Sequence, residues 1–199
     1  MKKYLFVLLV IPFFLIIYFP KEKDKTIIKF SEDEELFSVA ISYPVTGIFS
    51  LDQRIKKTVD TIYKEFKENL FLIPLVKNEL SINYTYIVVE ERYYNVVLFS
   101  YLNSNSNNSS IEVVYSFVYD NKTNSFVTLP KILTNEGNSI ILEELKKNKD
   151  FLESRGLLFT FDYTYLTIYQ NTLDNFLLVK LPLRNVSNLS FKDPEMEYY

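Results

Sequence analysis

The chain has 199 residues and contains no histidine, cysteine or tryptophan. These absences remove the commonest catalytic base, the thiol nucleophile and the usual nitrogen and sulfur ligands of zinc. Lys and Arg number 22 against 25 Asp and Glu, and a nucleic-acid partner is disfavoured because it requires a basic surface. The composition therefore predicts a binding or sensing domain that is not an enzyme and has no metal or cofactor.

The first residues combine positive charge with a long apolar run. Lys2 and Lys3 precede an almost unbroken hydrophobic stretch over residues 4–19, which is typical of an export signal. Residues 1–25 contain no Ala, Gly or Ser, the small residues that a signal peptidase needs at its cleavage site. We therefore expect an uncleaved signal-anchor, a transmembrane helix over residues 1–20, with a cleaved signal as the alternative.

Composition divides the rest of the chain into three parts. Residues 21–35 are rich in charge and are expected to form a tether. Residues 36–190 are predicted to form one domain, because they are globular in composition and long enough to bury a core. Residues 191–199 are expected to be a flexible tail. A short N-terminus before an apolar segment usually stays in the cytoplasm, so we expect a single-pass protein of the cell membrane whose C-terminal domain is extracytoplasmic.

The domain is predicted to open with a strand and a long helix. Residues 37–43 are predicted to form a strand that Pro44 ends. The helix is predicted to begin at Ser50, because Ser50 and Gln53 have the spacing of a capping box. Its apolar residues recur at helical spacing and are Leu51, Ile55, Val59, Ile62, Phe66 and Leu70. One face of this helix should therefore pack on a sheet.

A strand-rich block follows the helix. Residues 80–88 and 94–102 read as strands, and the Glu-Glu-Arg sequence at residues 90–92 separates them as a turn. Residues 103–110, NSNSNNSS, form a polar loop, after which apolar and polar side chains alternate over residues 111–119. These three runs predict an antiparallel meander.

The last part of the domain adds a helix and two strands. A helix is predicted over residues 139–154, with Gly156 at the position that commonly ends a helix. Residues 157–169 and 176–183 are expected to be two further strands. The order of elements predicts an α+β fold: an antiparallel β-sheet with two main helices packed on one face, preceded by one N-terminal transmembrane helix.

Three segments of the domain resemble a known family. They are ISYPVTGIFSLDQRIKKTVDTIYKEF at residues 41–66, the strand pair with its Asp-x-x-Thr turn within residues 96–134, and the closing Val-Lys-Leu-Pro strand within residues 156–183. The pattern resembles the extracytoplasmic domain of the anti-sigma factor RsiV and of the peptidoglycan deacetylase PdaC, in which this domain is not the catalytic one. The resemblance implies a membrane-tethered α+β module, which in RsiV-like proteins recognises lysozyme.

The sequence departs from that family in three ways. NSNSNNSS at residues 103–110 replaces a loop that typically contains glycine and histidine, so the family's loop contacts are not expected to carry over. We expect neither a cytoplasmic anti-sigma segment before the anchor nor a deacetylase domain after the module. The output functions of RsiV and PdaC are therefore not expected here.

Few residues are candidates for chemistry. Glu90 and Glu91 are adjacent and point apart in a turn, so a solvated turn is favoured over a catalytic dyad. Asp162 lies between two aromatic residues, and a hydrogen-bonded carboxylate is favoured over an acid–base catalyst. Residues 120–124 offer oxygen ligands but lack the glycine and glutamate of an EF-hand loop, so a turn is favoured over a calcium site.

Tyrosines on the predicted sheet allow two interpretations. Five of them are Tyr84, Tyr86, Tyr94, Tyr115 and Tyr119. They form either a patch for protein or glycan contact or a sheet core with hydroxyl groups at its rim, and the core is favoured. The polar loop and its flanks are the candidates for binding, because loops on rigid sheets commonly carry recognition. The candidate binding residues are Tyr101, Tyr115, Asn103, Asn105 and Asn107.

The sequence therefore predicts a membrane-anchored, extracytoplasmic binding or sensing module of a bacterial envelope. The resemblance implies a cell-wall-associated, lysozyme-like protein or a peptidoglycan fragment as its partner. The alternative is a structural or interaction protein of the cell envelope, which an exposed apolar surface or sheet edge would favour. A hydrolase that uses carboxylates alone is a third hypothesis, which facing buried carboxylates in a cleft would favour.

Overall fold

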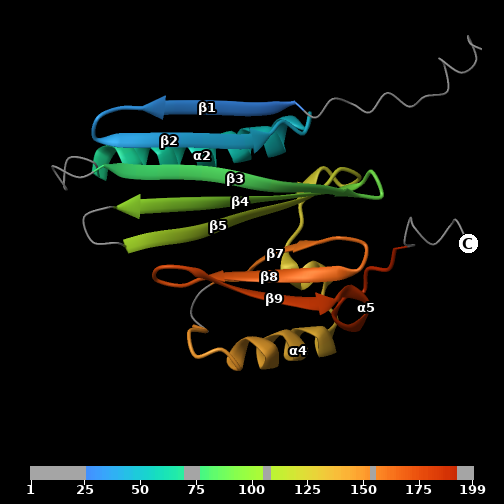
Figure 1. Ribbon diagram of the computed structural model, residues 1–199. Helices are drawn as coiled ribbons and strands as arrows, with labels where there is room; N and C mark the ends of the chain where they lie inside the picture. Colours follow the sequence, from blue (N-terminus) through green and yellow to red (C-terminus); the bar gives the residue numbers. More distant parts are fainter. Residues whose placement is uncertain (1–25, 70–76, 105–108, 153–155, 192–199) are drawn as a thin grey trace, which may run out of the picture.

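Two β-sheets stack between two helices in the computed structural model, which describes residues 26–69, 77–104, 109–152 and 156–191 (Figure 1). The larger sheet has six strands in the order β1 to β6, and the smaller sheet has three. The helix α2 packs on one face of the larger sheet, and the smaller sheet packs on the other face beneath β4 and β5. The helix α4 lies on the far side of the smaller sheet (Figure 1).

The first part of the chain builds the larger sheet. Its elements are β1 (Ile27–Asp33), β2 (Phe37–Pro44), α2 (Phe49–Asn69), β3 (Asn78–Val89), β4 (Tyr93–Ser104), β5 (Ser109–Asp120) and β6 (Ser125–Phe126). Neighbouring strands are antiparallel except β2 and β3, which are parallel. Parallel neighbours require a crossover connection, and the segment that contains α2 supplies it. The expected antiparallel meander is confirmed for β3 to β5, but a purely antiparallel sheet is wrong.

The second part of the chain builds the smaller sheet and its helices. Its elements are α3 (Leu129–Ile132), α4 (Asn135–Lys146), β7 (Leu158–Phe161), β8 (Tyr165–Asn171), β9 (Phe176–Pro182) and α5 (Leu183–Val186). All three strands are antiparallel to their neighbours. The α+β class is confirmed, but the expectation of two helices on one face of one sheet is wrong. Each long helix covers a different sheet, because the last strands form a sheet of their own.

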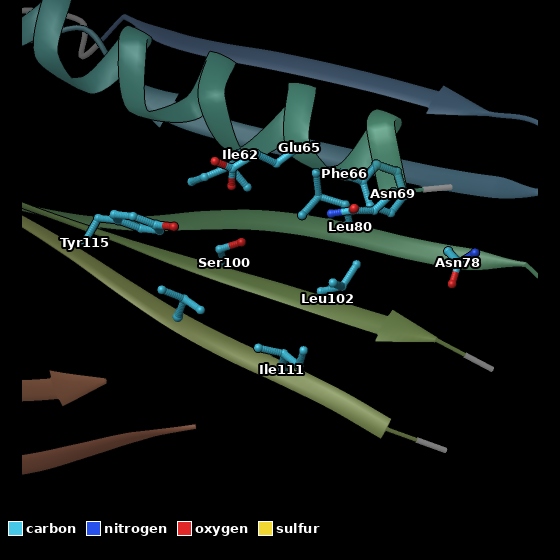
Figure 2. A pocket seen from close by; sticks show the side chains of 11 residues that line it. Ile62, Glu65, Phe66, Asn69, Asn78, Leu80, Ser100, Leu102, Ile111 and Tyr115 are labelled. Carbon is cyan, nitrogen blue, oxygen red and sulfur yellow. The ribbon is translucent and has the colours of Figure 1, made fainter. Parts of the chain in front are cut away.

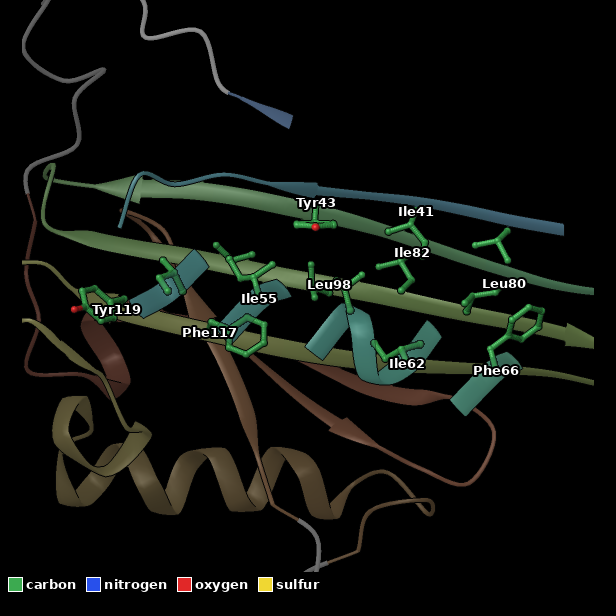
Figure 3. Close-up of a cluster of buried hydrophobic side chains, with 14 residues drawn as sticks. Ile41, Tyr43, Ile55, Ile62, Phe66, Leu80, Ile82, Leu98, Phe117 and Tyr119 are labelled. Carbon is green, nitrogen blue, oxygen red and sulfur yellow. The ribbon is translucent and has the colours of Figure 1, made fainter. Parts of the chain in front are cut away.

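The helix α2 buries one stripe of apolar side chains, as its period predicts. The buried residues are Leu51, Ile55, Val59, Ile62 and Phe66. They pack against inward-facing side chains of β2 to β5, among them Ile41, Ile82 and Leu98 (Figure 3). Full burial of one such aliphatic side chain stabilises the fold by about 1.5 to 3 kcal/mol. The stripe therefore holds α2 on the sheet.

The start of α2 differs from the prediction. Asp52 accepts hydrogen bonds from the backbone N–H and the hydroxyl of Thr46, both at 2.8 Å. Ser50 lies inside the first turn and donates to the hydroxyl of Tyr119 at 2.9 Å. The predicted capping box of Ser50 and Gln53 is therefore wrong. Asp52 holds the loop that precedes the helix, and Ser50 ties the helix to β5.

The later elements also differ from the predicted ranges. The helix α4 begins earlier than expected, because Thr134 caps it by accepting a hydrogen bond from the Gly137 N–H at 2.9 Å. It ends at Lys146, so Gly156 does not terminate it. The predicted strand over residues 157–169 is two strands, β7 and β8. Asp162 turns the chain between them, and its Oδ1 accepts hydrogen bonds from two backbone N–H groups at 2.7 and 2.6 Å.

Both ends of the domain extend beyond their expected boundaries. The strand β1 lies inside the segment expected to be a charged tether, so the folded part begins before residue 36. Phe191, expected in the flexible tail, stacks on Phe161 with ring centroids 6.0 Å apart. Residues 192–199 and the predicted signal-anchor over residues 1–20 lie outside the described residues. Across the ranges that the structure describes, no helix has the length and apolar character needed to span a membrane.

Candidate functional site

The helix α2 leaves part of the larger sheet uncovered beside β5, and a groove lies there. Two adjoining cavities of about 210 and about 490 Å³ form it, and both are lined by Ile62, Glu65 and Tyr115. The first cavity lies between the C-terminal half of α2 and strands β3 to β5 (Figure 2). The second continues along α2 to Arg54 and Lys57. We call this surface the α2–β5 groove.

Apolar side chains make up most of the first cavity. They are Ile62, Phe66, Leu80, Leu102, Ile111 and Val113. Ile62 and Phe66 are four residues apart and so share one face of the helix. The strand residues occupy the alternate positions that point toward α2 (Figure 2). Ile111 remains 38% exposed, so part of this apolar lining is open to solvent.

Polar groups lie among these apolar side chains and at the ends of the groove. Burial raises the pKa of the Tyr115 hydroxyl, and the nearby Glu65 raises this pKa further. Tyr115 therefore keeps its proton at neutral pH and can donate a hydrogen bond to a ligand. Arg54 and Lys57 line the second cavity, so the groove is acidic near its middle and basic at that end. This arrangement suits recognition of a partly apolar ligand.

Comparison with known proteins finds a similar fold but no matching sequence. No family model and no curated protein matches the sequence. A DUF3298 family protein from Pseudomonas aeruginosa shares the fold with a TM-score of 0.58 and 10% identity, over 84% of this chain and 96% of that chain. This chain has a DUF3298-like fold. A DUF3298 family member from Bacteroides fragilis has a TM-score of 0.49 and 10% identity, over 84% of this chain and 94% of that chain.

The DUF3298-like fold agrees at a coarse level with the resemblance seen in the sequence. The DUF3298 domain is the domain found in RsiV-like and PdaC-like proteins. The similarity in fold covers most of the described residues. At 10% identity it concerns the fold alone, so the site has to be argued from the residues of this chain.

The fold places the predicted binding residues on different surfaces of the molecule. Tyr115 points toward α2 and lines the groove. Tyr101 is paired with Glu112 and lies on the opposite face of the sheet, the face that carries the smaller sheet. Asn103 belongs to β4, and its Nδ2 donates to Glu79 Oε2 at 3.4 Å. Tyr101 and Tyr115 therefore lie on opposite faces of the sheet and do not form one surface.

The loop that was expected to carry recognition is described only at its ends. Asn105 and Asn107 lie outside the described residues. Sequence reasoning assigned Ile62 and Phe66 to a buried helix face and did not recognise that they also border a groove. Helical periodicity shows that Ile62 and Phe66 point toward the sheet. It carries no information on how much of the sheet the helix covers.

The other tyrosines support the core interpretation. Tyr119 is 2% exposed and packs in the core beneath α2. Tyr86 and Tyr94 stack with ring centroids 6.3 Å apart, and burial raises the pKa of Tyr86 to about 12. Tyr84 also packs against this core. Of this set, Tyr115 is the member that lines the groove.

The carboxylates considered for chemistry occupy turns. Glu90 and Glu91 form the turn between β3 and β4, with φ angles of 52° and 51°. Asp120 accepts two hydrogen bonds from the Arg92 guanidinium at 2.8 and 2.6 Å, and these bonds lower its pKa to about 2. Asp162 holds the turn before β8. In the described part of the chain, no three His, Cys, Asp or Glu side chains are grouped so as to hold a metal ion.

Proposed function

We propose that this chain is an extracytoplasmic binding module of a bacterial envelope, held at the membrane by its N-terminal segment. The α2–β5 groove is the binding surface, and its ligand is a segment of a cell-wall-associated, lysozyme-like protein. The observation that carries this proposal is the solvent-open apolar lining of the groove around Ile111. Exposed apolar surface with a few polar groups is typical of interaction sites.

The titratable groups of the groove favour binding over catalysis. Among the described residues that line the first cavity, Glu65 and Tyr115 are the ones that titrate. The raised pKa of Tyr115 keeps its hydroxyl protonated at neutral pH, so the group can donate a hydrogen bond and is not available as a general base. A carboxylate mechanism needs two acidic groups facing each other at a defined separation. The lining of this cavity supplies one.

Two features favour a protein ligand over a glycan. Six side chains of the first cavity are aliphatic or aromatic hydrocarbons. Such a lining favours an apolar side chain as the ligand over a polar sugar. The chain also carries more Asp and Glu than Lys and Arg, 25 against 22, so a cationic partner is attracted over a distance. The DUF3298-like fold adds support, because that domain is found in RsiV-like proteins.

A matched pair of substitutions tests the groove. Ile111 lines it and is 38% exposed, while Ile87 lies on β3 outside the groove and is 40% exposed. The full-length chain in nanodiscs is titrated with lysozyme and, separately, with peptidoglycan fragments. We expect Ile111→Asp to weaken lysozyme binding tenfold or more, a loss of about 1.4 kcal/mol, and Ile87→Asp to leave it unchanged.

Two further results decide between the candidate surfaces. Equal affinities for Ile111→Asp and Ile87→Asp would exclude the groove as the binding surface. Tyr101→Ala should bind as wild type, because Tyr101 lies on the other face of the sheet. Binding of peptidoglycan fragments in place of lysozyme, with the same dependence on Ile111, would keep the groove and change its ligand.

A structural or interaction protein of the cell envelope is the second candidate function. One observation favours it: β1 is an outer strand with exposed apolar side chains, including Ile27 and Phe30 at 41% and 44% exposed. An exposed edge of this kind is an association site for another strand. This candidate would gain support if the domain formed envelope assemblies while binding neither lysozyme nor glycan.

A further inference from the structure

The strand β1 leaves one long edge of the larger sheet open. It pairs with β2 over Ile27–Asp33, and the described residues place no strand beyond it (Figure 1). The N–H of Val45 donates to the carbonyl of Thr26, and the N–H of Glu34 donates to the carbonyl of Phe37, both at 2.8 Å. The backbone N–H and C=O groups of even-numbered β1 residues therefore point toward β2, and those of odd-numbered residues point to the open side.

The molecule covers comparable edges elsewhere. At β5, Asn171 accepts a hydrogen bond from the Val114 N–H at 2.8 Å and donates to the Val114 carbonyl at 2.9 Å. At β7, Asn95 Oδ1 accepts from the Phe161 N–H at 3.1 Å. Each asparagine takes the place of a neighbouring strand and so blocks strand addition. The open side of β1 has no such cover among the described residues.

The side chains of β1 favour association. Ile27, Ile28 and Phe30 are 41%, 39% and 44% exposed. The strand contains no proline, which is a common protection of exposed edges. Its odd-numbered positions carry Lys29 and Asp33, which have opposite charge and lie on the same face of the sheet. A second copy of the same strand is complementary to this pattern when it runs in the opposite direction.

We propose that β1 pairs antiparallel with β1 of a second copy of this chain, so that two six-stranded sheets become continuous. The register centred on Ser31 places Lys29 opposite the partner's Asp33, and the two-fold axis repeats this pair. Phe30 then lies diagonal to the partner's Phe30, within reach of an aromatic contact. Asp33 also pairs with Lys77 at 2.7 Å, but its side chain is 75% exposed and so stays accessible to a second cation.

Charge selects this register over its neighbours. A register centred on Lys29 opposes two lysines, and one centred on Glu32 opposes two glutamates. Like charges directly opposite each other destabilise a strand pair. A register centred on Phe30 sets Lys29 opposite the partner's Ser31 and forms no ion pair. Of these four registers, only the one centred on Ser31 pairs opposite charges without opposing like charges.

Cysteine cross-linking tests the pairing directly, because the chain contains no cysteine of its own. In the proposed register the two Ser31 Cα atoms lie about 5.5 Å apart, within the range of a disulfide. Ser31→Cys is compared with Thr85→Cys, which is also exposed but lies on the inner strand β3. Both full-length variants are oxidised mildly in detergent micelles at several protein concentrations, so association through the N-terminal segment affects both equally.

We expect Ser31→Cys to form a covalent dimer at least tenfold faster than Thr85→Cys. Equal rates for the two variants would overturn the proposal. Lys29→Asp added to Ser31→Cys should slow the cross-linking several-fold, because the new carboxylate would then oppose the partner's Asp33. Adding Asp33→Lys as well should restore the rate, since the ion pair returns with reversed polarity. Cross-linking that ignores both charge changes would overturn the register.

Discussion

The two halves of the molecule hold their helices in different ways. Side chains fix α2 to the larger sheet, through its buried apolar stripe and the hydrogen bond from Ser50 to Tyr119. The backbone also fixes the start of α4, because the Thr134 N–H donates to the Val186 carbonyl at 3.0 Å. Gly137 makes this close approach possible: a Cβ atom there would lie 1.9 Å from the Val186 oxygen.

This difference explains why the groove lies beside α2. A helix held by side chains alone can cross a wide sheet and leave one of its strands partly uncovered, as α2 leaves β5. The contact between α4 and α5 leaves no such freedom, because backbone atoms touch directly. Under the proposed function, the larger sheet with α2 is the binding half, and the smaller sheet with α4 supports it. The following predictions test that comparison.

The largest effect is expected in the binding half. Ile55 of α2 is fully buried between the helix and the sheet. Ile55→Asp should destabilise the domain by about 4 kcal/mol, because it buries a charge without a partner. Phe49 on the same helix is 76% exposed, so Phe49→Asp should change stability by less than about 0.5 kcal/mol. Denaturant unfolding measures both. Equal losses would mean that α2 does not pack as described.

The next effect tests the backbone contact in the supporting half. Gly137→Ala should cost about 2 to 3 kcal/mol, because the new methyl group collides with the Val186 carbonyl and neither backbone can move alone. Gly156 has open space around it, so Gly156→Ala should be nearly neutral. Thermal unfolding compares the two variants. A neutral Gly137→Ala would show that α4 is as adjustable as α2.

A third prediction concerns the junction between the halves. Asn171→Asp removes the Nδ2 donor to the Val114 carbonyl and should cost about 1 to 3 kcal/mol. Asn175 is exposed in the adjacent turn and only accepts through its side chain, so Asn175→Asp is the matched control. Denaturant unfolding should show this loss in the first variant only. Equal stabilities of the two variants would mean that the bond from Asn171 to the Val114 carbonyl does not hold the β5 edge.

The smallest effect is a pH dependence of stability. It arises from the ion pair between Arg92, in the turn from β3 to β4, and Asp120, at the end of β5. The Arg92 hydrogen bonds lower the pKa of Asp120 from its ordinary 3.8 to about 2. The folded state therefore favours the ionised carboxylate. Its contribution to the free energy of unfolding is complete above about pH 4 and is lost as the pH falls toward about 2. We expect a loss of about 1 kcal/mol, because Arg92 partly reaches solvent and is screened.

Asp120→Asn provides the control for this pH dependence. The variant should be less stable than wild type at about pH 7, and its stability should change less as the pH falls from about 4 to about 2. Unfolding by urea at a series of pH values gives both quantities. Parallel pH profiles for wild type and Asp120→Asn would assign the acid sensitivity to other carboxylates.

Local patterns predicted much of the binding half. The spacing of Leu51, Ile55 and Val59 fixed the buried face of α2, because helical geometry depends only on neighbours along the chain. Alternation over residues 111–119 likewise identified which side chains of β5 point toward α2. The strand β1 was missed because its charged neighbours suggested a tether. Its pairing with β2 depends on a turn at residues 34–36 that carries no strong turn signal.

Tertiary structure alone decided the candidate site. Sequence period establishes that Tyr101 and Tyr115 each lie on one face of a strand, but it does not relate the faces of two different strands. The register of β4 with β5 sets Tyr101 opposite Glu112, and this odd-to-even pairing puts the two tyrosines on opposite sides of the sheet. A shift of one residue would have put them together.

Local periodicity was enough to predict the α+β class, the buried stripe of α2 and the inward-facing side chains of β5, because each follows from a pattern over a few residues. Strand partners, the split into two sheets and the groove depend on contacts between distant segments. Such contacts are selected by the total burial that the whole chain achieves and not by any local pattern. The sequence pattern of Ile62 therefore predicts a core residue, and only its place at the edge of the helix cover makes it part of the groove.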